Sequence, residues 1–315
     1  MEHFCTLFDY GFLPQGLALH ASLRRHCPES VLWILCTDTQ ALESLRALDL
    51  PGARIVPLDE VEDEALLAVK PGRTRGEYCW TLTSSILLHL LRSHPEIPRL
   101  TYVDADVWFS KDPRQILSCM DEGRAQTMIT AHDYDPEHDQ SVQSGKYCVQ
   151  FVPFRNSPKG LEILEWWRIR CLEWCFNRQE PGRFGDQKYL DEWIRLFGDA
   201  VMELSETFLT MAPWNSNKHA SRADRAILFH FHGLRLHEGM LANLWRQYAI
   251  PEPVYRRFYL PYLEDLAKAL GAMAKAGMAP RLLPRRSKRL PDVWRRLRRQ
   301  RAGTERWRKL SLRGK

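Results

Sequence analysis

The stretch Leu100-Thr-Tyr-Val-Asp-Ala-Asp-Val-Trp-Phe109 places two carboxylates directly after residues typical of a buried β-strand. In an extended segment, residues two apart point to the same side, so Asp104 and Asp106 are expected to project together. Adjacent like charges beside apolar residues are costly unless a cation neutralises them. Mg²⁺ and Mn²⁺ prefer carboxylate oxygens and also bind phosphate oxygens. The stretch therefore indicates a divalent-metal site. The alternative is a turn with two solvated aspartates, because Asp-x-Asp is a common pattern.

Apolar runs and helical patterns alternate along the N-terminal part of the chain. β-favouring runs over residues 4–8, 31–36 and 53–58 are separated by helical patterns over 13–27 and 41–48. Strands that are apolar on both faces are typical of a mainly parallel sheet covered by helices, so we expect an α/β fold. Ligands in such folds bind outside the carboxyl ends of the strands. The candidates after the first strand, with a plain turn as the alternative, are Phe8, Asp9 and Tyr10.

Two later segments also present polar side chains where a turn or strand ends. A glycine turn precedes Asp186 and Gln187 at a helix start, where an aspartate is also a natural cap. Residues 226–233 form a strand with His230 and His232 on one side, ended by a glycine, and an asparagine-containing loop at 211–217 precedes it. These segments add candidate ligands to the paired carboxylates.

Two loops carry charged residues whose role is less defined by their pattern. Lys70, Arg73 and Arg75 lie in a loop that contains proline and glycine. Basic side chains there are candidates for binding phosphates, and a solvated loop is the default. The loop at residues 132–138 contains His132, His138 and three acids. We expect that loop to be a flexible surface segment rather than a metal site.

Taken in order, these four segments resemble nucleotide-sugar-dependent glycosyltransferases of the GT-A fold. The resemblance is to the glycogenin-like and lipopolysaccharide galactosyl- or glucosyltransferase group and covers residues 3–240. Bacterial chains assigned as sugar transferases, with E-Y-C-W-T-L-T, Y-x-D-A-D and F-G-D-Q-K-Y-L, are more similar still. The implied architecture is a GT-A domain over residues 1–250, with a Rossmann-like central sheet.

The resemblance also implies roles for the candidate residues. Asp104 and Asp106 would hold Mn²⁺ or Mg²⁺ against the diphosphate of the donor, with His230 as third ligand and His232 as a second candidate. Asp186 and Gln187 would lie near the reacting sugar. Phe8 to Tyr10 would contact the base or ribose, and UDP-sugars with retention of configuration are favoured.

The sequence departs from the family pattern at two places. The family often has asparagine where this chain has Cys148, which cannot supply an amide contact. The basic residue expected after the histidine motif is Leu236 here, and its neighbours Arg235 and His237 are the candidates for binding phosphate.

The composition is that of a globular protein. The chain has 315 residues, of which 44% are hydrophobic and eleven are tryptophan, enough for one large core or two modest ones. It has no run of about 18 apolar residues that would predict a transmembrane helix. The N-terminal residues lack the pattern of a secretory signal, and the eight scattered cysteines are typical of reduced core thiols. We therefore expect a cytoplasmic protein.

Positive charge is concentrated at the C-terminal end. Residues 281–315 contain 15 Lys/Arg and 2 Asp/Glu, a net charge of +13, which leaves about −7 for residues 1–280. After an amphipathic helical extension over 251–280, arginines with tryptophans at helical spacing favour binding to an anionic membrane surface, here the inner face of the cytoplasmic membrane. A solvated tail is one alternative. Nucleic acid is the less favoured partner, because the body is acidic and no nucleic-acid-binding motif is present.

Together these features predict a metal-dependent glycosyltransferase of cell-surface polysaccharide or lipopolysaccharide synthesis, with a nucleotide sugar as donor and a glycan or lipid-linked acceptor. One alternative is a non-catalytic sugar-nucleotide-binding relative, which the changes at Cys148 and Leu236 leave open. Another is a nucleotidyltransferase, although that class usually has a glycine-rich basic loop where this chain has Asp9-Tyr-Gly-Phe-Leu-Pro14.

Overall fold

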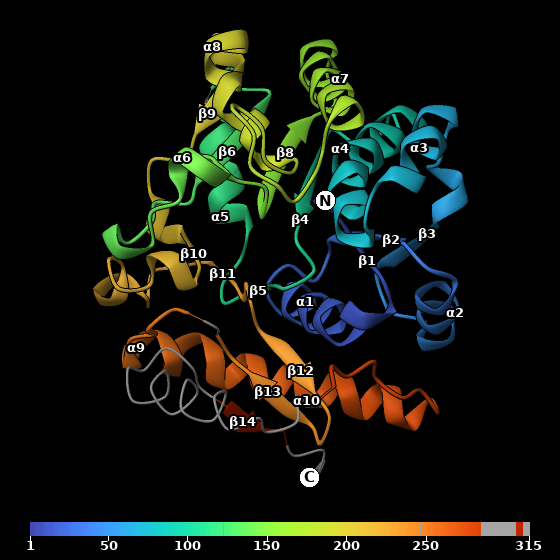
Figure 1. Ribbon diagram of the computed structural model, residues 1–315, viewed down its shortest axis with the longest axis vertical. Helices are drawn as coiled ribbons and strands as arrows, with labels where there is room; N and C mark the ends of the chain where they lie inside the picture. The colour runs from blue at the N-terminus through green and yellow to red at the C-terminus, as the bar shows by residue number, and fades with distance from the viewer. Residues whose placement is uncertain (122, 246, 285–306, 311–315) are drawn as a thin grey trace.

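Strand β1 (His3–Phe8) lies in the central sheet (Figure 1). Its alternate side chains belong to two different cores, one on each face of that sheet. The computed structural model describes residues 1–121, 123–245, 247–284 and 307–310. Phe4 and Phe8 pack in a core with α1 (Leu13–His26) and α2 (Thr39–Leu48). Cys5 and Leu7 pack in a second core with α4 (Arg75–Ser93) and α7 (Pro158–Glu173). The predicted α/β arrangement, with helices on both faces of the sheet, is confirmed.

The central sheet has eight strands. β1 lies between β2 (Val31–Cys36) and β4 (Arg99–Val103), and β3 (Ala53–Pro57) follows β2, all in parallel. Beyond β4, the sheet continues with β8 (Phe151–Arg155), which is antiparallel to β4, and then with β6 (Thr127–Ala131), which is antiparallel to β8. β7 (Tyr147–Cys148) and β9 (Val201–Glu203) both pair with β6. Because the strand order reverses between β1 and β4, the carboxyl ends of these two strands flank the crevice where such sheets bind ligands.

Two smaller sheets contain the other strands of the described residues. One consists of β10 (Thr210–Met211), β11 (Leu228–His230) and β5 (Val107–Phe109), and the other of β12 (Arg235–His237), β13 (Leu241–Asn243) and β14 (Trp307–Lys309). The remaining helices are α3 (Glu64–Val69), α5 (Arg114–Leu117), α6 (Ser141–Ser144), α8 (Trp193–Phe197), α9 (Glu252–Val254) and α10 (Leu260–Lys275), with a π-helical turn at Tyr255–Tyr259. Short 3-10 turns occupy Tyr10–Phe12, Leu58–Glu60, Lys70–Gly72, Ser118–Met120, Pro136–His138, Gln187–Glu192, Gly198–Ala200, Thr207–Leu209, Pro213–Asn215 and Ala220–Arg222.

Helix α4 begins at a capping box that its sequence encodes locally. The hydroxyl of Thr74 accepts the N–H of Glu77, and the Glu77 carboxylate accepts the N–H of Thr74. The box satisfies two backbone donors that the first turn of a helix otherwise leaves unpaired. It thereby fixes Arg75 as the first helical residue, at the edge of the crevice.

Helix α10 packs against α1, as Figure 1 shows, and a buried carboxylate strengthens this contact. Asp265 accepts two hydrogen bonds from Arg25 of α1, at 2.8 and 3.0 Å. It also accepts one from Nε1 of Trp108 in β5, at 2.9 Å. The extension over 251–280 therefore shares a core with the N-terminal part of the chain.

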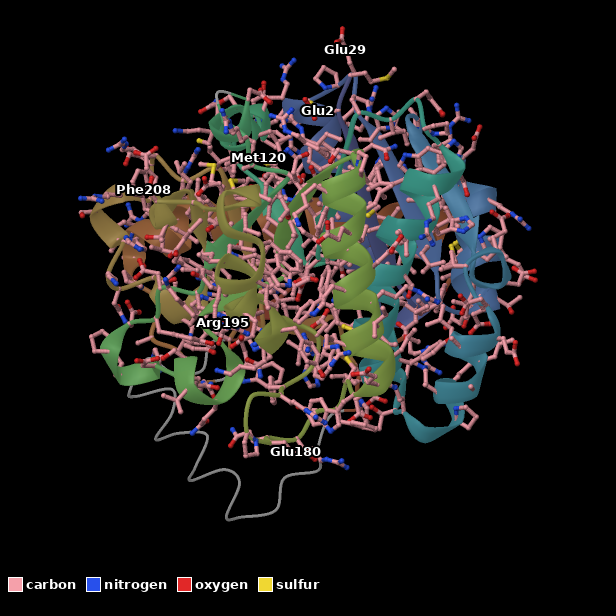
Figure 2. All side chains as sticks on the ribbon, turned by 90° about the horizontal axis from the view of Figure 1, so that it is seen from above. Glu2, Glu29, Met120, Glu180, Arg195 and Phe208 are labelled. Atoms are coloured by element: carbon pink, nitrogen blue, oxygen red, sulfur yellow. The ribbon has the colours of Figure 1, made fainter. Side chains whose placement is uncertain are left out.

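Most of the basic tail lies outside the described residues, so its membrane association stays a prediction. Its described part corrects the expectation of helical spacing, because Trp307–Lys309 form strand β14 and pair with β13. None of the described helices has the length and apolarity needed to span a bilayer. Figure 2 shows the described side chains from above, with Glu29 and Glu180 at opposite edges of the molecule.

Candidate active site

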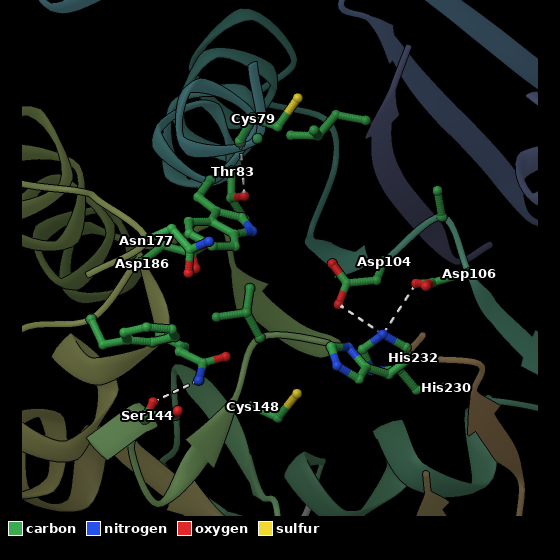
Figure 3. Close-up of a pocket in the computed structure, with 18 of the residues that line it drawn as sticks. Cys79, Thr83, Asp104, Asp106, Ser144, Cys148, Asn177, Asp186, His230 and His232 are labelled. Carbon is green, nitrogen blue, oxygen red and sulfur yellow. Dashed lines mark hydrogen bonds and ion pairs between the residues drawn. The ribbon is translucent and has the colours of Figure 1, made fainter. Parts of the chain in front are cut away.

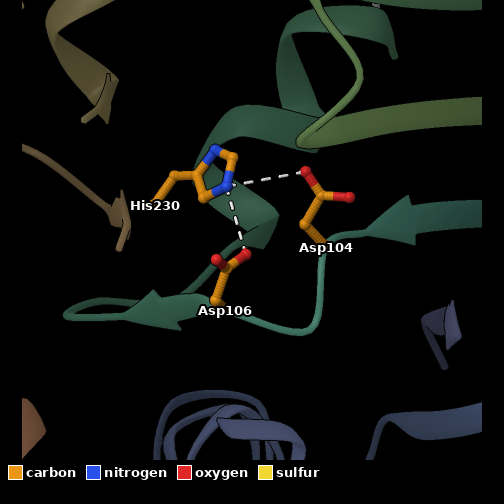
Figure 4. A group of neighbouring side chains, drawn as sticks. All are labelled: Asp104, Asp106 and His230. Atoms are coloured by element: carbon orange, nitrogen blue, oxygen red, sulfur yellow. Dashed lines mark ion pairs between the residues drawn. The ribbon is translucent and has the colours of Figure 1, made fainter. Parts of the chain in front are cut away.

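Asp104, Asp106 and His230 converge where β4 ends near β11 (Figure 4). Nε2 of His230 lies 3.1 Å from Oδ1 of Asp106 and 3.7 Å from Oδ2 of Asp104. One potential ligand atom from each residue lies within 4.8 Å of the other two. Two carboxylates and one imidazole suit a divalent ion such as Mn²⁺. Three protein ligands leave coordination positions for phosphate oxygens and water.

The carboxylates meet through a turn, which corrects the expectation of an extended segment. β4 ends at Val103, and the N–H of Val107 donates to the Asp104 carbonyl at 3.0 Å before β5 begins. The N–H of Phe231 donates to the Asp106 carbonyl at 2.8 Å. The turn is thus hydrogen-bonded to the residue that follows His230, which fixes the three candidate ligands relative to one another.

Burial and mutual charge shift the pKa values within this cluster in different directions. Burial opposes the charge on His230, but the two carboxylates outweigh it and raise its pKa well above the usual value. Burial is also outweighed at Asp106, where His230 lowers the pKa to about 2. At Asp104 burial prevails and the pKa is raised. A proton on His230 neutralises the same charge that a bound divalent cation would neutralise.

A cavity of about 640 Å³ opens beside the cluster, as Figure 3 shows. Asp104, Asp106 and His230 lie on one side of the cavity, and Asp186 lies on the opposite side. The volume falls within the range of about 300–1,000 Å³ that is usual for small-molecule sites. The two acidic segments, Asp104 to Asp106 and Asp186, therefore line the same cavity.

Asp186 is buried, and it does not have the helix-capping role that its position suggested. Its carbonyl accepts Nε1 of Trp167 at 2.9 Å, and its side chain does not cap the following turn. Gly185 precedes it with φ +53°, and a Cβ there would approach the ring of Trp80 to 3.3 Å. Burial, and then the charge of Asp104, raises the pKa of Asp186 to about 8.

Gln187 also lines the cavity. Its Nε2 donates to the carbonyl of Ser144 at 2.6 Å, which anchors the side chain to the segment that follows β6.

The residues after β1 divide between the cavity and the core. Phe8 and Asp9 line the cavity, and Asp9 pairs with Nη1 of Arg75 at 2.8 Å. Tyr10 does not line it, which corrects the sequence-based expectation. Its ring is buried, and its hydroxyl donates to the carbonyl of Ala279 at 2.7 Å. Tyr10 therefore packs in the core and binds the segment that follows α10, instead of contacting a ligand in the cavity.

Two of the three basic candidates near the start of α4 do not reach the cavity, which corrects the prediction for Lys70 and Arg73. Lys70 pairs with Glu62 at 2.6 Å, and Arg73 donates to the carbonyl of Leu172 at 2.7 Å near the end of α7. Neither residue lines the cavity. Arg75, two residues further on, is the one of the three basic candidates that does line it.

Around the His230 motif, His232 and Arg235 line the cavity. The guanidinium of Arg235 lies 5.4 Å from the centre of the Phe12 ring. Leu236 is buried in the core, and His237 packs against Trp307 with their ring centres 4.9 Å apart. Of the three residues considered for the basic position of the family, Arg235 is thus the one at the cavity.

The loop at residues 132–138 is not simply a surface segment, which corrects another expectation. His132 is 3% exposed, lines the cavity and stacks on Tyr134 with ring centres 4.7 Å apart. Its carbonyl accepts Nε1 of Trp214 at 2.9 Å. Burial is the main cause that lowers the pKa of His132 to about 3, so its ring is neutral. Cys148 lines the same cavity.

No protein-family model matches the chain. The uncharacterized protein YfnF of Bacillus subtilis (strain 168) is 32% identical over 250 residues, which cover 74% of this chain and 82% of YfnF. The uncharacterized protein YfnD of the same organism is 28% identical over 287 residues, covering 87% of this chain and 91% of YfnD.

Solved structures share the fold at low identity. The galactosyltransferase LgtC, in a complex with donor and acceptor sugar analogs, superposes with a TM-score of 0.54 at 13% identity over 84% of this chain and 95% of LgtC. The bifunctional glycosyltransferase WbbM gives a TM-score of 0.51 at 10% identity over 87% of this chain and 50% of WbbM. The GT-A architecture predicted from the resemblance is therefore confirmed. The chain belongs to the same family as YfnF of Bacillus subtilis and has the GT-A fold.

Proposed function

We propose that this protein is a metal-dependent glycosyltransferase that moves a sugar from a nucleoside-diphosphate sugar to a glycan or glycolipid acceptor. UDP-sugars are the favoured donors, and synthesis of cell-surface polysaccharide or lipopolysaccharide is the favoured context. The single observation that carries the proposal is the cluster of Asp104, Asp106 and His230 at the ligand-binding edge of a GT-A sheet, facing Asp186 across one cavity.

The donor set of the cluster fits a divalent cation such as Mn²⁺ or Mg²⁺. Asp104, Asp106 and His230 would hold that ion, and their two oxygens and one nitrogen are close enough to share it. When bound, the ion would neutralise the diphosphate and stabilise the departing nucleoside diphosphate. Arg75 and Arg235, which both line the cavity, would supply further positive charge to the phosphates.

The opposite side of the cavity would hold the donor sugar. Asp186 and Gln187 carry oxygens and an amide at the cavity wall, groups that bind sugar hydroxyls. A cation bound at Asp104 would offset one of the two causes that raise the pKa of Asp186, and the ionised carboxylate would then stabilise positive charge that develops at the anomeric carbon. Transfer with retention of configuration belongs to the same proposal, on the strength of the family resemblance.

Thermal unfolding in the presence of nucleotide sugars tests this function. UDP-, GDP-, CMP- and dTDP-sugars would each be added with and without Mn²⁺, and the protein's melting temperature measured. A ligand at a hundred times its Kd stabilises the folded state by about 2.7 kcal/mol, or about 5 °C in a chain of this size. We expect the melting temperature to rise by this amount with the sugars of one nucleotide base, and only when Mn²⁺ is present.

Two variants make the test specific. Asp106→Ala should abolish the metal-dependent rise, because the cluster loses one ligand. Asp112→Ala is the matched control, since Asp112 pairs with Arg114 outside the cavity and should leave the rise unchanged. No response to any nucleotide in the unaltered protein would refute the proposal. Binding without release of free nucleoside diphosphate in a turnover assay would favour the non-catalytic alternative.

The acceptor and the membrane contact belong to the same proposal. Tyr134, Trp214 and Tyr248 line the cavity and are aromatic rings of the kind that stack on sugars. The basic tail over 281–315 would hold the enzyme near a lipid-linked acceptor. Cosedimentation with anionic vesicles but not with neutral ones is expected, and equal sedimentation with both would count against this part.

A further inference from the structure

Gln150 contacts two of the three candidate metal ligands. It lies between β7 and β8, and its side chain is completely buried. Its backbone carbonyl accepts the N–H of Asp104 at 3.3 Å. Its Oε1 lies 3.0 Å from Nδ1 of His230. Gln150 therefore links the turn that carries the carboxylates to the strand that carries the imidazole.

The partners of Gln150 determine the direction in which its amide points. The Nε2 group faces the backbone carbonyl of Thr210 at 3.5 Å, and a carbonyl can only accept. The amide oxygen must therefore face His230, and it can only accept as well. Consequently Nδ1 of His230 carries the hydrogen, and Nε2 is the nitrogen turned toward Asp104 and Asp106.

We propose that Gln150 is a positioning residue for the metal site. It holds the His230 ring so that the Nε2 lone pair faces the two carboxylates when the metal is bound. A reversed ring would leave the buried amide oxygen without a donor, which is costly in an interior with no access to water. This role rests on the proposed metal-dependent function and goes beyond it, because Gln150 would act through His230 and not touch the metal.

Direct metal binding tests the role without relying on activity. Partners that orient a metal-binding histidine typically contribute about 10–100-fold to metal affinity. We expect Gln150→Met to weaken Mn²⁺ binding by that factor, measured by calorimetry on the full chain without nucleotide. The nitrogen coupling of His230 to Mn²⁺, seen by pulsed electron paramagnetic resonance, should weaken with it.

Two further variants separate positioning from general packing. Gln15→Met removes a similarly buried amide from α1, outside the cavity, and should bind Mn²⁺ like the unaltered protein. Gln150→Glu, kept protonated by its burial, still has an oxygen that accepts from Nδ1 and an O–H that donates to the Thr210 carbonyl, so it should bind Mn²⁺ with close to the original affinity. Unchanged Mn²⁺ binding in Gln150→Met would overturn the role, and so would equally weak binding in Gln150→Glu.

A measurement on the unaltered protein covers the case in which Gln150→Met does not fold. Nitrogen-15 spectra of the Mg²⁺-bound protein should show the His230 hydrogen on Nδ1, and a hydrogen on Nε2 would overturn the proposal. Failure of the unaltered protein to bind any divalent ion would remove the metal site itself. That result is distinguishable from the one that overturns only the role of Gln150, in which Gln150→Met binds Mn²⁺ as tightly as the unaltered protein.

Discussion

Replacing Asp265 by alanine should destabilise the protein by about 2.5 kcal/mol, the middle of a range of about 1–4 kcal/mol. The carboxylate is 4% exposed and accepts hydrogen bonds from Trp108 and Arg25. Without it, the buried N–H of Trp108 has lost its acceptor, which costs about 1–3 kcal/mol. The loss at Arg25 adds about 0–1 kcal/mol, because this side chain is 43% exposed and can turn to water.

The assay is urea unfolding followed by circular dichroism, with the melting temperature as a second measure. A loss of about 2.5 kcal/mol lowers the melting temperature of a chain of this size by about 5 °C. Asp265→Asn keeps an acceptor for Trp108 and should cost only about 1 kcal/mol. Lys268→Ala removes a partner that is 72% exposed and should change stability by less than about 0.5 kcal/mol. If the asparagine variant were as unstable as the alanine variant, the Trp108 contact would not be the cause.

Two further predictions concern the cavity. Arg75→Ala should weaken nucleotide-sugar binding and leave the melting temperature nearly unchanged. Arg73→Ala should lower the melting temperature and leave nucleotide-sugar binding intact, because Arg73 donates to backbone carbonyls at and just after the end of α7. Thermal unfolding and equilibrium binding, measured on both variants, test these expectations. Loss of binding in Arg73→Ala but not in Arg75→Ala would contradict the assignment. The second prediction concerns Asp186, whose pKa is raised by burial and by Asp104 to about 8, against about 3.9 in an unfolded chain. Since the folded metal-free protein keeps a proton that the unfolded chain loses, stability falls as pH rises from about 4 to about 8. Asp186→Asn should flatten this dependence in melting curves recorded without metal, and an unchanged slope would argue against the buried proton.

The layers of the fold could be predicted because their signals are local. The apolar runs of β1 to β3 alternate with the helical patterns of α1 and α2, and each pattern lies within one short stretch of consecutive residues. The cluster of candidate metal ligands was found differently. The paired carboxylates suggested a metal site by themselves, but His230 joined them only through the family resemblance, because its contact with Asp106 spans more than a hundred residues.

The errors in the candidate site have a common physical origin. Whether Lys70, Arg73 or Arg75 reaches the cavity depends on how the start of α4 packs against distant segments such as the end of α7, which the local sequence does not reveal. Tyr10 follows Asp9 directly, yet a 3-10 turn directs its hydroxyl to Ala279.

Two other residues were missed because distant segments bury them. His132 lies in a polar stretch, but a loop some eighty residues later covers it through Trp214. Gln150 had no distinguishing signal, since its partner His230 lies eighty residues away in sequence.

Strand β14 has a practical consequence for producing the protein. It pairs with β13, which also pairs with β12, so a chain that ends before Trp307 would leave one edge of β13 without a partner. Unpaired strand edges recruit strands from other molecules and promote aggregation. A shortened protein intended to test the arginine-rich tail should therefore keep residues 307–310 and replace part of residues 285–306 with a neutral linker. Such a variant would separate the effect of charge from the loss of solubility.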